Sequence, residues 1–299
     1  MSRALISCAF AALAMAMAPM SSHAGMLYAA RADGSVTRSD VATGVESYFA
    51  SVGDNAGGLA FDSANNLYVS NPYGNTITRF TPCGIGSFFA NTGLNGPGAL
   101  AFDAAGNLFV TNGFGNTIIR ITPGGDQSEF ASTGLNVPYA LAFDAAGNLF
   151  LSNFGGNTID EFTPDGVRSV FVSTDLNGPT GLAFDAAGNL FVANAFANNI
   201  MRYTPDGVGS VFISTGLNAP VGLAFDDSGR LYVGNVLAHT ITRFTPDGTG
   251  SLFQGPSATH AHLFAFHSPQ VVPEPATVIL VATGAISFWA FRRGRLSCV

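Results

Sequence analysis

The sequence predicts an all-β fold, a six-bladed β-propeller whose four-stranded blades are each about 41 residues long. Three observations predict this fold. An Ala-Phe-Asp segment recurs at a constant interval, short apolar runs alternate with turn residues, and the two ends of the repeat region complement each other. Four short strands in a repeat of this length are typical of a propeller blade.

The first strand of each unit contains a phenylalanine that recurs every 41 residues, at Phe61, Phe102, Phe143, Phe184, Phe225 and Phe266. The second strand begins at Leu27, Leu67, Leu108, Leu149, Leu190 and Leu231. A third strand follows an Asn-rich loop, and the fourth ends on an aromatic residue at Tyr48, Phe89, Phe130, Phe171, Phe212 and Phe253. Each unit therefore supplies four strands.

Turn residues separate these strands. Asp-Ala-Ala-Gly-Asn links the first two strands, and Thr-Pro-Asp-Gly links the last two, for example at residues 163–166. Proline presets φ and glycine accepts positive φ, so both are turn signals with a mechanism. These breaks leave no run long enough for two helices per unit, which excludes a helical solenoid.

The two ends of the repeat region predict a closed ring. The region opens with strands two to four, from Met26 to Ala50, and it closes with an unpaired first strand near Leu263–Phe266. Pairing these fragments completes a sixth blade and removes exposed sheet edges. We therefore expect the propeller to occupy residues 25–270.

Composition and the N-terminus narrow the class of protein. The 299 residues have a formal net charge of −7, with twelve arginines against 19 acidic residues and no basic patch, so no nucleic-acid partner is expected. Arg3, a short apolar run from Ala9 to Ala18 and the small residues around Ala24 predict a signal peptide over residues 1–24. The alternative is a buried N-terminal helix, which the shortness of the run disfavours.

The segment from Pro179 to Val192 resembles the NHL repeat and is similar to repeats of the virginiamycin B lyase and gluconolactonase-type propellers. The resemblance covers nearly all of residues 26–270. The resemblance implies the fold but no particular activity, because one propeller scaffold carries many activities. The chain departs from the usual NHL pattern because asparagine follows the second strand, at Asn71, Asn112, Asn153, Asn194 and Asn235.

The C-terminal segment 271–299 has a different character. Pro273, Glu274 and Pro275 precede an apolar run from Ala276 to Phe291, which we expect to form a single transmembrane helix, and Arg292, Arg293 and Arg295 follow it. This order resembles the PEP-CTERM sorting signal of Gram-negative bacteria. The resemblance implies an exosortase-type processing partner and transfer of a membrane-anchored precursor to the outer surface or extracellular matrix. The alternative is a plain membrane anchor.

Chemistry in a propeller is expected at the mouth of the central channel. The residues expected there are Gly57, Gly98, Tyr139, Thr180, Val221 and His262, none of them acidic. A site for a hard divalent metal is therefore not predicted, nor is any cofactor. His260 and His262 are weak catalytic candidates. Side chains of residues two apart on an extended strand point to the same side, so these two imidazoles would lie together. Alternatively, they cap the closing blade or face solvent.

The loops between the second and third strands predict a ligand-binding face. Aromatic rings stack on apolar sugar faces, and amides bind hydroxyls. The candidate residues are Tyr73, Phe114, Tyr139, Phe154, Phe196, His239 and His262. The equally weighted alternative is that the asparagines occupy turn positions and the rings cover the sheet. The recurring aspartates (Asp62, Asp103, Asp144, Asp185, Asp226) are expected to be turn residues, and the recurring arginines rim or packing residues.

The sequence thus favours an exported, surface-sorted propeller that acts as a non-catalytic binding module for exopolysaccharide or a surface protein. The alternative is a virginiamycin B lyase-like or gluconolactonase-like enzyme that uses a channel-mouth histidine.

Overall fold

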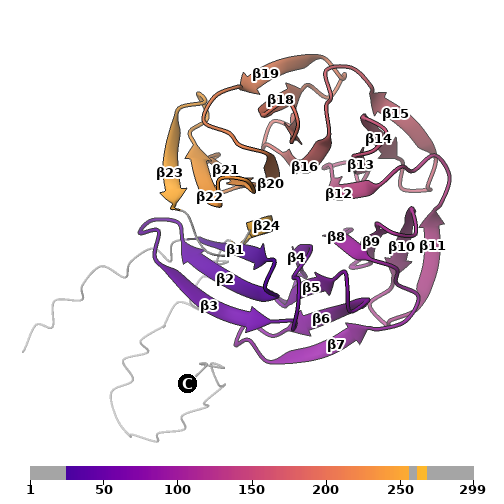
Figure 1. Cartoon of the computed structure of the whole chain (residues 1–299). Coiled ribbons are helices and arrows are strands. Elements are labelled where there is room, and N and C mark those ends of the chain that lie inside the picture. Colours follow the sequence, from indigo (N-terminus) through magenta and orange to yellow (C-terminus); the bar gives the residue numbers. More distant parts are fainter. Residues whose placement is uncertain (1–24, 256–260, 268–299) are drawn as a thin grey trace, which may run out of the picture.

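In a computed structural model, which describes residues 25–255 and 261–267, six four-stranded antiparallel sheets surround a central axis (Figure 1). The predicted fold is confirmed. The predicted signal peptide and the C-terminal segment, with its expected helix, lie outside the described residues. Within the described part of the chain, no helix is long and apolar enough to cross a membrane.

Each blade is a meander, and its innermost strand comes first in the sequence in every blade except blade 1, where the innermost strand is the last one described. Blade 1 contains β24 (Ala261–His267), β1 (Met26–Arg31), β2 (Ser35–Asp40) and β3 (Glu46–Ser51). Blade 2 contains β4 (Leu59–Phe61), β5 (Leu67–Asn71), β6 (Thr76–Phe80) and β7 (Gly86–Ala90). Blade 3 contains β8 (Pro97–Phe102), β9 (Leu108–Asn112), β10 (Thr117–Ile121) and β11 (Gln127–Ala131).

The remaining blades repeat this order. Blade 4 contains β12 (Pro138–Phe143), β13 (Leu149–Asn153), β14 (Thr158–Phe162) and β15 (Arg168–Val172). Blade 5 contains β16 (Pro179–Phe184), β17 (Leu190–Asn194), β18 (Asn199–Tyr203) and β19 (Gly209–Ile213). Blade 6 contains β20 (Pro220–Phe225), β21 (Leu231–Asn235), β22 (Thr240–Phe244) and β23 (Gly250–Gln254).

The two ends of the repeat region meet in blade 1. Strand β24 pairs antiparallel with β1, so that Leu27 lies opposite Phe266 and Met26 opposite His267 (Figure 1). The C-terminal strand thereby becomes the innermost strand of a blade whose other three strands come from the N-terminal side. This pairing confirms the closure that the complementary ends predict.

Aromatic triads hold neighbouring blades together. Phe150 on β13 contacts Phe171 of its own blade and Phe184 of the next, with ring centroids 5.1 Å apart in both pairs and nearly perpendicular planes. Edge-to-face contact of this kind adds to the apolar burial. The same triad recurs around Tyr28, Tyr68, Phe109 and Phe191. The recurring phenylalanines therefore pack between blades, as their spacing indicates.

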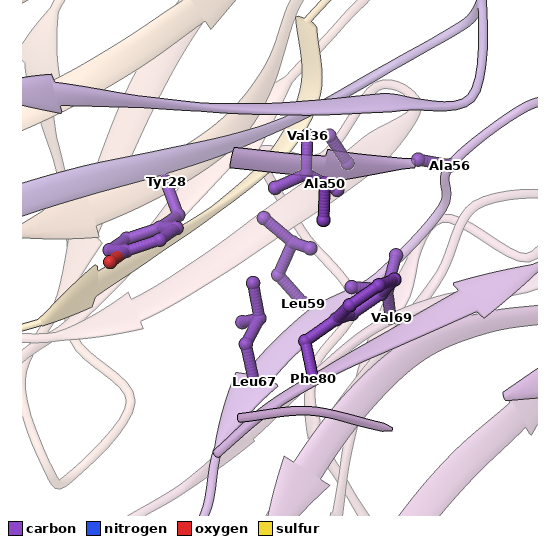
Figure 2. Close-up of a cluster of buried hydrophobic side chains, with 9 residues drawn as sticks. Tyr28, Val36, Ala50, Ala56, Leu59, Leu67, Val69 and Phe80 are labelled. Atoms are coloured by element: carbon purple, nitrogen blue, oxygen red, sulfur yellow. The ribbon is translucent and has the colours of Figure 1, made fainter. Parts of the chain in front are cut away.

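The apolar core is divided among the gaps between blades. Figure 2 shows the cluster between blades 1 and 2, where Tyr28, Val36 and Ala50 meet Leu59, Leu67 and Phe80. In blade 1, Phe49 of the outer strand belongs to the triad around Tyr28. Tyr48 does not, because the strand register makes it equivalent to Phe88 of blade 2. The sequence alignment at Tyr48 is therefore wrong by one residue, and Tyr48 is exposed.

Candidate functional site

One face of the propeller carries the loops that join the second and third strands of the blades. At the same position of this loop in blades 2, 3, 5 and 6, a large apolar side chain projects into solvent. Tyr73, Phe114 and Leu237 are each 67% exposed and Phe196 is 66% exposed. Blade 4 has Gly155 at this position, with Phe154 directly before it. Four large apolar side chains, repeated at one position and all exposed, form an apolar ring on this face.

Two further rings join this face between blades 4 and 5. The centroid of Tyr139, at the start of β12, lies 5.9 Å from that of Phe154. Phe154 in turn lies 5.2 Å from Phe196. The structure therefore brings Tyr139, Phe154 and Phe196 into one contiguous aromatic surface.

A hollow of about 260 Å³ opens on the same face, between blades 2, 3 and 4, and its lining includes the predicted channel-mouth residues Gly57, Gly98 and Tyr139. Its walls include Phe114, Tyr139, Pro72 and Pro138. Asn55 contributes the only side-chain carboxamide, and none of the lining residues is charged. The hollow is thus an uncharged, largely apolar depression that joins two of the sequence-predicted aromatic residues.

Two side-chain polar groups face the hollow without a partner among the described residues. Neither the hydroxyl of Tyr139 nor the carboxamide of Asn55 forms a hydrogen bond with any residue that the structure describes. Burial raises the pKa of Tyr139 from its ordinary 10 to about 12, so the phenol, already protonated at neutral pH, stays protonated at more alkaline pH as well. Both side chains are consequently available to a ligand as hydrogen-bonding groups.

The central channel is narrow and apolar. Its lining consists of glycine, alanine, leucine and phenylalanine residues of the innermost strands, including Gly58, Leu100 and Phe264. At the channel mouth, the hydroxyl of Thr180 lies 3.1 Å from the carbonyl of Ala193 and 2.9 Å from that of Pro220. Thr180 is therefore engaged in joining blades 5 and 6. Residues 25–255 and 261–267 contain no group of three or more His, Cys, Asp or Glu side chains that could hold a metal ion.

The histidines have separate positions. His239 occupies the repeat position of Asn75, Asn116, Asn157 and Asn198, and like them it has a positive φ, here 54°. His267 lies between blades 1 and 2, with its ring centroid 4.9 Å from that of Phe61. His262 belongs to β24, but its side chain, like all of His260, is outside the described part of the structure.

The recurring aspartates are turn residues. In blade 4, Asp144 Oδ1 accepts hydrogen bonds from the backbone N–H groups of Ala146 and Asn148, and Oδ2 accepts one from the Asn148 side chain. The first and last of the recurring arginines, Arg38 and Arg243, pack on aromatic rings. The Arg38 guanidinium carbon lies 5.7 Å from the centroid of the Phe49 ring. Arg243 lies over Phe253 at 5.9 Å.

Sequence reasoning missed three elements of this face. Leu237 completes the apolar ring, and its place at a 41-residue interval from Phe196 could have found it. Asn55 stands where the other blades have Gly96, Val137, Gly178 and Ala219, so a comparison between repeats could have singled it out. The hollow itself arises where side chains are missing. A sequence search for reactive or polar side chains does not detect a missing one.

Comparison with known proteins places these features in context. Residues 45–269 match the virginiamycin B lyase family, and residues 271–295 match the PEP-CTERM protein-sorting motif. No curated protein sequence matches the chain.

Three solved structures share the fold at low identity. A chain of a nidogen/laminin complex is 21% identical with a TM-score of 0.74, covering 82% of this chain and 98% of its own. A catalytically inactive histidine-to-alanine variant of virginiamycin B lyase from Staphylococcus aureus, with quinupristin, is 20% identical with a TM-score of 0.65, covering 83% and 94%. A putative gluconolactonase is 19% identical with a TM-score of 0.60, covering 70% and 80%.

Proposed function

We propose that this chain, which belongs to the virginiamycin B lyase family and carries a PEP-CTERM sorting motif, is a non-catalytic binding module of the bacterial surface. The motif indicates an exported, surface-sorted protein. The proposed ligand is exopolysaccharide, and a surface protein is the other candidate partner. Binding takes place on the loop face, where the aromatic residues gather.

The apolar ring of Tyr73, Phe114, Phe196 and Leu237 is the observation that carries this proposal. Large apolar side chains exposed together on one face commonly mark an interaction site. Aromatic rings suit sugars in particular, because their faces stack on the C–H groups of a pyranose. The uncharged hollow beside Phe114 adds to the same surface.

Affinity electrophoresis tests this function. The full chain is run through gels that contain polysaccharide from the producing bacterium, alongside a Tyr73→Ala/Phe114→Ala/Phe196→Ala variant. Retardation of the wild type and free migration of the variant are expected. A matched variant with Tyr48→Ala and Phe88→Ala removes equally exposed rings from the outer strands and should be retarded like the wild type. Equal retardation of all three proteins would exclude the loop face.

The tail gives the proposed route to the surface. The motif implies processing by an exosortase, which would release the propeller from a precursor anchored by residues 276–291. Replacement of Pro273, Glu274 and Pro275 by alanine is expected to hold the protein in the membrane fraction at its unprocessed mass. Normal release of this variant, measured by fractionation and mass spectrometry, would leave the simple anchor as the explanation.

Family membership favours one other function, that of a lyase or lactone hydrolase using His260 or His262. The family takes its name from an enzyme, and replacing a histidine inactivates the Staphylococcus aureus relative. Incubation of the chain with quinupristin and with simple lactones decides between the two. The binding proposal expects no turnover, whereas turnover that disappears in His262→Ala would establish the enzyme.

A further inference from the structure

The hollow between blades 2, 3 and 4 exists because blades 2 and 3 have glycine at three positions where other blades have larger side chains. Gly57 and Gly98 stand where the later blades have Tyr139, Thr180 and Val221. Gly113 stands where the other blades have Pro72, Phe154, Ala195 and Val236. All three glycines line the hollow, so the missing side chains create the space and Tyr139 forms its wall. A propeller of identical blades would have no such depression.

The polar group in the hollow is also specific to this place. Asn55, with φ of 47°, is the one asparagine at a position filled elsewhere by Gly96, Val137, Gly178 and Ala219. Its carboxamide has no hydrogen-bond partner among the described residues, and the same is true of the Tyr139 hydroxyl. Both side chains are partly exposed, so water can satisfy them in the free protein and hydroxyl groups of a ligand can take the place of that water.

From these observations we infer that the hollow takes one uncharged pyranose ring of a polysaccharide. The C–H face of the ring stacks on Phe114 and Tyr139, and its hydroxyls bond to the Asn55 carboxamide and the Tyr139 hydroxyl. This inference rests on the proposed function and assigns it a subsite and a ligand class. It selects a neutral sugar over a uronic acid, because no cation lines the hollow and the chain is acidic overall.

Phe114 and Phe88 provide a contrast for the test. Both rings are largely exposed, at 67% and 73%, so replacement by alanine removes a surface phenylalanine in each case. Only Phe114 lines the hollow, whereas Phe88 lies on the outer strand β7 of blade 2. The two variants therefore separate loss of a ring in the hollow from loss of an exposed ring elsewhere.

Gly113→Val supplies an independent test by filling the space. A Cβ at Gly113 meets only the Gly96 carbonyl oxygen, at an ordinary 3.5 Å, and valine is the residue of blade 6 at this position. The substitution should leave the fold unchanged, which thermal unfolding checks. By contrast, a Cβ at Gly98 would lie 2.8 Å from Thr111 Oγ1, so that glycine is unsuitable for the purpose.

Saturation-transfer NMR of the full chain measures binding of the methyl glycosides of glucose, galactose, mannose and rhamnose, with the methyl glycoside of glucuronic acid as the charged comparison. At least one neutral glycoside is expected to bind and the glucuronide is not. Phe114→Ala should weaken binding roughly tenfold, and Asn55→Ala about two- to tenfold. Gly113→Val should abolish it, while Phe88→Ala should stay within about twofold of the wild type.

The inference would be overturned if no neutral glycoside bound, or if the glucuronide bound equally well. Equal effects of Phe114→Ala and Phe88→Ala, or undiminished binding by Gly113→Val, would also overturn it. If Gly113→Val still binds polysaccharide in gels but the triple aromatic variant does not, the proposed function stands and the hollow is not its subsite.

Discussion

At the scale of single residues, the buried asparagines that follow the second strands join each blade to the loop before it. Asn194 is fully buried, and its Oδ1 accepts a hydrogen bond from the backbone N–H of Asn177 at 3.1 Å. Its Nδ2 donates to the carbonyl of Asp175, also at 3.1 Å. One side chain thus satisfies a donor and an acceptor of the loop between blades 4 and 5, which explains why asparagine recurs here.

Asn194→Ala should lower the free energy of unfolding by about 2–3 kcal/mol, because it leaves a donor and an acceptor without partners in a buried place. Chemical denaturation measures the loss. Asn198→Gly is the control, since its Oδ1 also accepts a backbone hydrogen bond, from Ala219, but the side chain is exposed and water can replace it, and glycine tolerates the φ of 51° at this residue. The control should lose under about 1 kcal/mol. Similar losses in both variants would contradict the role given to burial.

At the scale of elements, the triads predict which phenylalanine matters most. Phe150 is 4% exposed and contacts rings of its own blade and the next, whereas Phe184 is only half-buried. Phe150→Ala should cost about 3–5 kcal/mol, the range for a large buried aromatic residue, and Phe184→Ala should cost less. Urea denaturation measures both. A larger loss for Phe184→Ala would mean that the recurring phenylalanine, and not the second-strand ring, dominates the contact.

The blade order and the ring closure were predictable from sequence because they depend on periodic features. Repeated turn residues and apolar strands specify the same local structure six times, and Ala-Phe-Asp marks the end of the first strand in five copies and Ala-Phe-His in the sixth. The site was less predictable, because it depends on departures from the repeat. Tyr139, Phe154 and Phe196 could be named from their loops, but their contact with one another depends on how adjacent blades pack. The hollow depends on missing side chains at Gly57, Gly98 and Gly113.

Strand β24 adds a pH-dependent element to the closing blade. Burial lowers the pKa of His267 below its ordinary value of 6.5, so the folded state favours the neutral ring beside Phe61. The unfolded chain then binds more protons, and stability rises with pH across this window. The contribution of His267 is complete above the unfolded pKa and declines as pH falls below about 6.5.

Thermal unfolding at pH 5 and pH 7.5 tests this effect. The wild type should melt at a lower temperature at pH 5, and His267→Gln should lose most of that difference. The carboxyl groups whose pKa values are lowered by hydrogen bonds, such as those of Asp165 and Asp247, titrate below their ordinary 3.8 and stay ionised at both pH values. An unchanged pH difference in His267→Gln would assign the effect to another group.

At the scale of the whole molecule, stability depends on one strand contributed by the far end of the repeat region. In blade 1, β24 covers the edge of β1, and Phe264 is 8% exposed in the cluster shared with blade 6. A chain that ends at Gly255 would keep six blades in sequence but leave one of them with three strands. Its β1 edge would present unpaired backbone groups, the feature that promotes association between sheets.

Comparison of chains ending at Gly255 and at Gln270 isolates this contribution, because both lack the sorting motif and only the longer one contains β24. The shorter chain should lose at least the burial of Phe264, about 1.5–3 kcal/mol, and its β1 edge should make it associate. Thermal unfolding and size-exclusion chromatography with light scattering record the two effects. If the shorter chain remained monomeric and equally stable, closure by β24 would not be what holds the ring, and the inner strands of the other five blades would have to sustain it alone.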